Sequence, residues 1–193
     1  MNLAVLCTAR YIGPMFTRLF FLFFISTAIS FSAPIPNLEA TDQNGRPFQA
    51  HSLKGSYILI SFVFSSCPMP KMCPLTMRLN KKVQTLWKQK IKAPLSLLVV
   101  TLDPGGDTPE VLKKYGARFS LDEKTSFLVT GDPQKLSDFG SAFNVAGWPS
   151  GNTTVHNLKT ILVGPNLDEL KQYKENEWTP EQLIKDAQAF LRQ

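Results

Sequence analysis

The stretch Ile58–Trp87, ILISFVFSSCPMPKMCPLTMRLNKKVQTLW, contains the change of pattern that decides the fold of this 193-residue chain. Residues 57–64 form an apolar run, interrupted only by Ser61, with the length and β-rich composition of a buried strand. A proline-rich loop with two thiols, Cys67 and Cys73, comes next. Apolar residues then recur at helical spacing, which predicts an amphipathic helix with Pro74 at its first position. The thiols are therefore expected between a buried strand and a helix N-terminus. The free backbone N–H groups of a helix N-terminus stabilise thiolates, so this position suits a redox or metal site.

The remainder of the chain alternates predicted strands with predicted helices. Strands are expected at 95–102, 127–130 and 158–163, with a hairpin partner for the last at 170–173. Helices are expected to begin after Thr108, Asp132 and Thr179, each of which is followed by proline. Asn44-Gly45 predicts an earlier hairpin turn. The order predicts an α/β protein with a mixed central sheet, helices on both faces and a C-terminal β-hairpin plus helix. With a cysteine pair after the first core strand, the assignment is a thioredoxin-like fold.

The N-terminus has the pattern of an export signal. The first 32 residues lack acidic side chains, carry Arg10 and Arg18, and continue into an apolar run followed by small residues. The apolar stretch is about 13 residues long, shorter than the roughly 20 of a comfortable spanning helix. We expect residues 1–32 to be a cleaved signal peptide or a retained membrane anchor, and residues 33–193 to be the folded domain. The domain is expected to be exported and periplasmic, either soluble or anchored in the inner membrane.

The charge of the chain does not indicate a nucleic-acid partner. The formal net charge is +6, or +4 once the two arginines of residues 1–32 are set aside. Several lysines follow the cysteines, but no aromatic or glycine-rich recognition motif accompanies them. We interpret these lysines as the solvated side of a helix: Lys81, Lys82, Lys88, Lys90 and Lys92.

Cys67 and Cys73 are the only cysteines outside the predicted export segment. A structural disulfide is common in exported proteins, but so short a loop contributes little chain-entropy stabilisation. A redox Cys-x-x-Cys pair lies within one helical turn, whereas five residues separate these thiols. Disulfide formation remains geometrically open to such a loop. The pair is therefore redox-capable, without the spacing of an efficient general oxidoreductase.

His156 precedes the strand expected at 158–163, where a thioredoxin-type oxidoreductase usually carries a cis-proline. Two thiolates and one imidazole form a ligand set that suits copper in either oxidation state, and also zinc. His51, the other histidine, is expected to be a surface or hydrogen-bonded side chain.

Other side chains near the thiols have several possible roles. Met69 and Met72 could offer thioether sulfur to Cu(I), but we expect them to pack around the loop. Lys71 could lower the thiol pKa values by its charge. Asp103 and Asp107 follow a core strand, and one of them could support the site, although helix capping and turn formation are simpler roles.

Three segments carry a resemblance to a known family. They are FVFSSCP…CPLTM in residues 62–77, TLDPGGDTPEVLKKYGARF in 101–119, and VHNLKTILVGPNLDEL in 155–170. Across residues of about 35–192 the chain resembles the SCO/SenC copper chaperones, whose domains are thioredoxin-like and exported or membrane-tethered. The family's motif has three residues between its cysteines, whereas this chain has five. The longer, methionine-bearing loop could change copper affinity, redox potential or partner.

The resemblance implies a metallochaperone rather than an enzyme. It implies that Cys67, Cys73 and His156 bind copper, as Cu(I) or Cu(II). The partner it implies is the copper-bearing subunit of cytochrome c oxidase, whose binuclear copper centre would receive the metal or have its thiols maintained. Another exported copper protein is the alternative partner.

Two other functions compete with this hypothesis. A thiol–disulfide oxidoreductase acting on an exported copper protein or another client requires a reversible Cys67–Cys73 disulfide. A peroxidase of the peroxiredoxin kind shares the fold, but the threonine and proline typical of its PxxxTxxC pattern are missing before Cys67.

Overall fold

The computed structural model describes residues 34–145 and 157–192. Over these residues the chain forms seven β-strands, one short 3-10 helix and four α-helices. In chain order they are β1 (Glu39–Asp42), β2 (Pro47–Gln49), η1 (Ala50–Leu53), β3 (Tyr57–Val63), α1 (Cys73–Lys90), β4 (Leu95–Thr101), α2 (Pro109–Arg118), β5 (Ser126–Thr130), α3 (Pro133–Ala142), β6 (Lys159–Val163), β7 (Glu169–Lys174) and α4 (Pro180–Phe190). The predicted order of strands and helices is confirmed.

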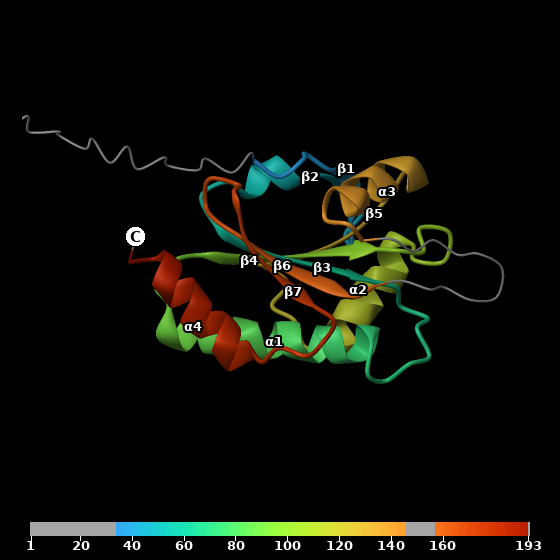
Figure 1. Cartoon of the computed structure of the whole chain (residues 1–193). Helices are drawn as coiled ribbons and strands as arrows, with labels where there is room; N and C mark the ends of the chain where they lie inside the picture. Colours follow the sequence, from blue (N-terminus) through green and yellow to red (C-terminus); the bar gives the residue numbers. More distant parts are fainter. Residues whose placement is uncertain (1–33, 146–156, 193) are drawn as a thin grey trace, which may run out of the picture. The chain divides into compact units, whose positions relative to one another are not determined.

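A single mixed sheet organises the domain, with the strand order β2-β1-β5-β4-β3-β6-β7. The three central strands β3, β4 and β5 run parallel, while β6 is antiparallel to β3 and pairs with β7 as the predicted hairpin. Helices α1, α2 and α4 lie on one face of the sheet and α3 lies on the other (Figure 1). The predicted α/β architecture with helices on both faces is therefore confirmed.

Short local signals set the ends of the helices. The hydroxyls of Thr108 and Thr179 and the carboxylate of Asp132 each accept a hydrogen bond from the third residue of the helix that follows. Proline occupies one of the first two positions of all four described α-helices. Helix α1 differs from the sequence prediction, because it begins at Cys73 rather than at Pro74 and Met72 is its N-cap.

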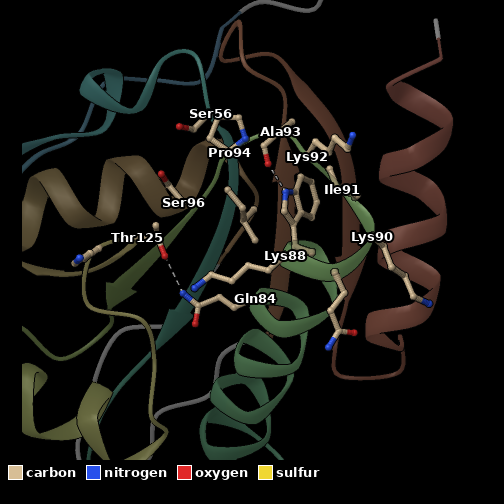
Figure 2. A pocket seen from close by; sticks show the side chains of 14 residues that line it. Ser56, Gln84, Lys88, Lys90, Ile91, Lys92, Ala93, Pro94, Ser96 and Thr125 are labelled. Atoms are coloured by element: carbon tan, nitrogen blue, oxygen red, sulfur yellow. Dashed lines mark hydrogen bonds between the residues drawn. The ribbon is translucent and has the colours of Figure 1, made fainter.

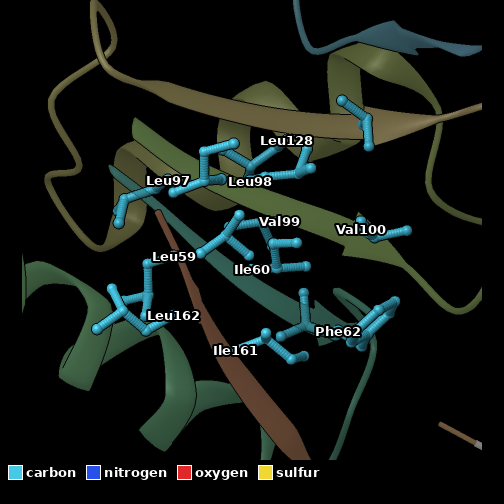
Figure 3. Packing of buried hydrophobic residues seen from close by; sticks show 14 of the residues in the cluster. Leu59, Ile60, Phe62, Leu97, Leu98, Val99, Val100, Leu128, Ile161 and Leu162 are labelled. Carbon is cyan, nitrogen blue, oxygen red and sulfur yellow. The ribbon is translucent and has the colours of Figure 1, made fainter. Parts of the chain in front are cut away.

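The core fills both faces of the central strands. All seven residues of β3 are buried and all but Ser61 are apolar, as expected of a strand covered on both sides. Figure 3 shows side chains of β3, β4, β5 and β6 packed together across the sheet. Helix α1 contributes fully buried side chains to the same core, including Met77 and Trp87. The central strands are therefore rigid supports for the loops at their ends.

Among residues 34–145 and 157–192, no helix is both long enough and apolar enough to cross a membrane. The predicted export segment, residues 1–32, lies outside the described residues and stays a prediction.

Candidate metal site

The two thiols lie at the carboxyl ends of the central parallel strands. Strand β3 ends at Val63, which pairs in register with Thr101 at the end of β4. The loop carrying Cys67 and the loop carrying Asp103 and Asp107 therefore leave the sheet at one edge. Ligand sites of open α/β sheets form at this edge.

Both thiols are buried and neither forms a disulfide. Cys67 is 8% exposed and Cys73 is fully buried in the first turn of α1. Cys67 is near enough to Cys73 to raise the pKa of its thiol. The thiol of Cys67 also points toward the carbonyl oxygen of Met69, with 4.0 Å between Sγ and O. The predicted pair is thus brought together in its reduced form.

Burial controls the protonation of Cys73. Desolvation is the largest cause that raises the pKa of its thiol to about 12, opposed by hydrogen bonds from the main chain of Phe64 and of Cys73 itself. The neighbouring Cys67 raises this pKa further. Lys71 is not among the groups that shift it, so the predicted effect of Lys71 is wrong for Cys73. The metal-free protein therefore keeps Cys73 as a neutral thiol at neutral pH.

The loop between the cysteines is fastened to two distant elements. The guanidinium of Arg78 on α1 donates to the carbonyl oxygen of Pro70 at 3.0 Å. The side-chain amide of Asn176, between β7 and α4, donates to the carbonyl oxygens of Lys71 and Met72 at 3.1 and 3.2 Å. These hydrogen bonds hold a loop that has no regular secondary structure of its own.

The two methionines of this loop differ in their surroundings. Met72 is half-buried and packs against the core, as predicted. Met69 is 41% exposed, so the prediction that it packs around the loop is wrong. The nearby prolines account for this difference, because Pro68 and Pro70 restrict how the chain on each side of Met69 can turn inward.

Asp107 ties the cysteine loop to β4. Its carboxylate is fully buried and accepts hydrogen bonds from the main-chain N–H and the hydroxyl of Ser65 and from the hydroxyl of Thr101. Asp103 instead accepts from the N–H of Gly106 in an exposed turn. Of the two predicted support residues, Asp107 therefore reaches the segment before Cys67.

Replacing Asp107 by asparagine is expected to lower the free energy of unfolding by about 1–3 kcal/mol. The amide keeps one oxygen acceptor but places N–H groups where the three donors of Ser65 and Thr101 converge, so buried donors lose partners. Urea denaturation of the metal-free protein measures the change. Asp103→Asn is the matched control and is expected to cost less than about 1 kcal/mol, because its turn is exposed. Equal losses in the two variants would contradict the anchoring role of Asp107.

Of the two histidines, the structure describes only His51. His156 lies outside the described residues, so its predicted ligand role is untested. His51 lies in η1, where its ring Nε2 is 2.8 Å from the carbonyl oxygen of Ile35, as expected of a hydrogen-bonded histidine. Within the described part of the chain, no three His, Cys, Asp or Glu side chains form a ready metal cluster.

A hollow lies at the opposite end of α1 from the thiols. A cavity of about 740 Å³ lies between the end of α1 and the start of β4, and Trp87 and Pro94 are among the residues that line it. Figure 2 shows side chains around this cavity, Pro94 among them. With a rise of about 1.5 Å per residue, the 18 residues of α1 separate it from Cys73 by roughly 25 Å. The lysines around it, Lys88, Lys90, Lys92 and Lys124, are expected to offset the partial negative charge of the helix C-terminus. The predicted lysine face is confirmed as exposed or half-buried.

Comparison with known proteins identifies relatives over most of the domain. The SCO1/SenC family model matches residues 31–192. A candidate copper-binding protein from Stutzerimonas stutzeri is 30% identical over 138 residues, which cover 68% of this chain and 65% of that protein. An SCO2-like protein from Rickettsia conorii is 36% identical over 111 residues, which cover 56% of this chain and 50% of that protein. The match thus spans between half and two thirds of the length of these relatives.

Solved structures show the same fold. BsSco, a member of the Sco family of cytochrome c oxidase assembly proteins with a disulfide switch, is 26% identical, with a TM-score of 0.70 over 82% of this chain and 94% of that one. A SCO1/SenC family lipoprotein from Bacillus anthracis is 24% identical, with a TM-score of 0.74 over 82% and 95%. Yeast Sco1 with copper bound is 20% identical, with a TM-score of 0.71 over 84% and 90%. The last two support the fold alone. Because the family model covers nearly the whole thioredoxin-like domain, the chain belongs to the SCO1/SenC family.

Proposed function

We propose that this protein binds copper with Cys67, Cys73 and His156 and delivers it to another exported protein. The observation that carries the proposal is the pair of buried thiols, neither of them in a disulfide, beside the carboxyl ends of the central parallel strands. Sulfur ligands at close range select soft ions, of which Cu(I) is the main biological example. The relative from Stutzerimonas stutzeri, which is 30% identical, is described as a candidate copper-binding protein, and this supports the choice of metal.

The protonation of the thiols makes metal binding a proton-releasing step. Cys73 is a neutral thiol at neutral pH, whereas a metal ligand must be a thiolate. A bound copper ion would provide the neighbouring positive charge that stabilises a thiolate buried away from water. The site therefore fits a soft cation, and we expect its affinity for copper to rise with pH.

The third ligand is proposed from the sequence and from the elements near it. Strand β6 begins at Lys159, and its Thr160 pairs with Ser61 of the antiparallel β3. The start of β6 therefore lies beside the end of β3, which supports His156 as a ligand from the segment just before it. One imidazole added to two thiolates gives a three-coordinate site that accommodates either oxidation state of copper.

Delivery to the copper-bearing subunit of cytochrome c oxidase is the partner we propose. BsSco belongs to a family of cytochrome c oxidase assembly proteins, which supports this acceptor. The proposed location is outside the cytoplasm, with residues 1–32 serving as an export signal or membrane anchor and residues 33–193 as the working domain. The basic residues and the apolar run of residues 1–32 support an exported location. The oxidoreductase alternative is not favoured by a feature of the described residues.

An anaerobic copper titration of the purified protein tests the proposal. Cu(I) is followed by competition with a chromophoric chelator, and Cu(II) by its thiolate-to-metal absorption band. We expect one copper per chain and a loss of affinity in His156→Ala, because the replacement removes a ligand to the metal. A tenfold loss corresponds to about 1.4 kcal/mol.

The chain contains only two histidines, so His51→Ala is the natural control. It removes an imidazole that is hydrogen-bonded to the main chain and is expected to leave copper binding unchanged. Equal copper affinity in wild type and His156→Ala would contradict the proposed ligand set. No copper binding by the wild type would contradict the proposed function itself.

A further inference from the structure

The cavity at the end of α1 is surrounded by positive charge. Four of the 14 residues that line it are lysines, and none of the 14 is acidic. Lys88 forms an ion pair with Asp122, whereas the described part of the chain offers no ion pair to the other three, Lys90, Lys92 and Lys124. The partial negative charge at the end of α1 accounts for Lys90 in the last helical turn, but Lys92 and Lys124 lie outside the helix. A cluster of unpaired lysines attracts anions.

The cavity lies at the amino edge of the sheet, which is the edge where β3 and β4 begin. Tyr57 and Leu95, the first residues of these strands, pair in register, and Leu95 lines the cavity. Helices α1 and α4 pack together and end on this side of the domain (Figure 1). Leu191, which follows α4, is 45% exposed and is one of two exposed large apolar side chains of the described residues. Lysines beside an exposed apolar side chain are the combination with which proteins bind an anionic bilayer surface.

The described chain also begins at the amino edge. Pro34 forms a β-bridge with Asp168, and the main-chain N–H of Ile35 donates to the carbonyl oxygen of Leu167 at 2.7 Å. These contacts join the start of the domain to the turn between β6 and β7, and the end of β6 pairs with the start of β3. Residues 1–32, the predicted export signal or membrane anchor, therefore precede the domain on the side that carries the unpaired lysines.

We propose that the amino edge is a docking surface for the anionic headgroups of a phospholipid bilayer. Figure 2 shows the side chains of Lys90 and Lys92 extending outward from the end of α1, so their ammonium groups are free to meet headgroup phosphates. Leu191 supplies an apolar side chain that enters the interface between the headgroups. The position of the chain start favours a bilayer over an acidic protein as the occupant, because an anchor at this edge would hold it against a membrane.

This docking sets the direction in which the thiols face. Cys67 and Cys73 follow the carboxyl end of β3, whose seven residues span roughly 20 Å. A domain that rests on its amino edge therefore turns the thiol pair away from the bilayer. The inference goes beyond the proposed copper binding and does not depend on it.

Vesicle co-sedimentation of residues 31–193 tests the docking surface. These residues form one compact unit that contains the whole described core, so the predicted anchor is left out and far-UV circular dichroism checks the fold. We expect the domain to sediment with vesicles of phosphatidylcholine mixed with anionic phosphatidylglycerol, and to stay in solution with phosphatidylcholine alone. Added salt is expected to weaken the binding, because it screens the attraction between lysines and headgroups.

The double variant Lys90→Gln/Lys92→Gln locates the surface. Each lysine removed from an anionic bilayer surface is expected to weaken binding about fivefold, and the pair about 25-fold. Both side chains are exposed and without an ion pair in the described residues, so the unfolding temperature is expected to stay that of the wild type.

Lys113→Gln/Lys174→Gln is the matched control, because it removes the same charge from the opposite side. Lys113 is exposed near the start of α2, and Lys174 is exposed at the end of β7, where it pairs with Lys159 at the carboxyl edge. This control is expected to keep most of the affinity of the wild type, because headgroup attraction falls off within a Debye length.

Four outcomes would overturn the inference. The wild-type domain would fail to sediment with anionic vesicles, or the two double variants would lose affinity equally, as a response to net charge alone. Release from the vesicles by inorganic phosphate at constant ionic strength would instead indicate a site for a free anion. Tighter binding to polyglutamate than to the vesicles would indicate an acidic protein partner. None of these outcomes affects the copper titration, and a failure to bind copper leaves the vesicle result standing.

Discussion

Replacing Cys73 with serine is expected to reduce Cu(I) affinity by more than about 100-fold, beyond the loss typical of residues that only support a ligand. The serine hydroxyl is a hard oxygen donor that stays protonated at neutral pH, whereas Cu(I) prefers thiolate sulfur. The side chain is fully buried in the first turn of α1, so no solvent-exposed group can take its place without moving the helix. Chelator competition under anaerobic conditions measures the change.

Two further variants make this prediction specific. Cys67→Ser is expected to weaken binding to a similar extent, because it removes the other thiolate of the proposed site. Met69→Leu keeps the size of an exposed loop side chain but removes its thioether, and is expected to leave affinity within a few-fold of wild type. Strong Cu(I) binding by Cys73→Ser would refute the two-thiolate site. A large loss in Met69→Leu would add that methionine to the ligands.

Replacing Phe62 with alanine is expected to lower the free energy of unfolding by about 4 kcal/mol. Phe62 is 1% exposed in the middle of the sheet, and its ring packs against Phe139 and Phe143 at centroid distances of 6.2 and 6.1 Å. Deleting the ring removes apolar burial and leaves a cavity between β3 and the helix that covers this face. Equilibrium urea denaturation of the copper-free protein measures the effect.

Phe127 provides the comparison for this core prediction. Its ring packs on Phe48 at 5.3 Å but is only partly buried, so Phe127→Ala is expected to cost less than half as much. Similar losses in Phe62→Ala and Phe127→Ala would show that the α3 face of the sheet is not packed as described.

The fold could be predicted because its signals are local. The apolar run of β3, the threonine and aspartate caps and the Asn44-Gly45 turn each act within a few residues, and each appears where expected. The start of α1 was displaced by one residue for an equally local reason: Met72 takes the cap position, and proline is compatible with either of the first two helical positions.

The surroundings of the thiols could be predicted only in part. The cysteine pair and the nearby Asp107 were visible in the sequence, because their loops follow adjacent parallel strands. Asn176 was not, since it meets the cysteine loop from more than 100 residues away in the sequence.

The fastening of the cysteine loop has a consequence for how this site can diversify. The hydrogen bonds from Arg78 and Asn176 all end on main-chain carbonyl oxygens, those of Pro70, Lys71 and Met72. A carbonyl oxygen is present whatever side chain its residue bears, so the anchorage does not depend on the amino acids of the loop. The side chains between the sulfur atoms can therefore be exchanged, by mutation or by design, while the backbone that spaces those atoms keeps its attachment. The side chains of the loop between Cys67 and Cys73, which a partner protein would contact, could therefore change while the metal ligands stay the same.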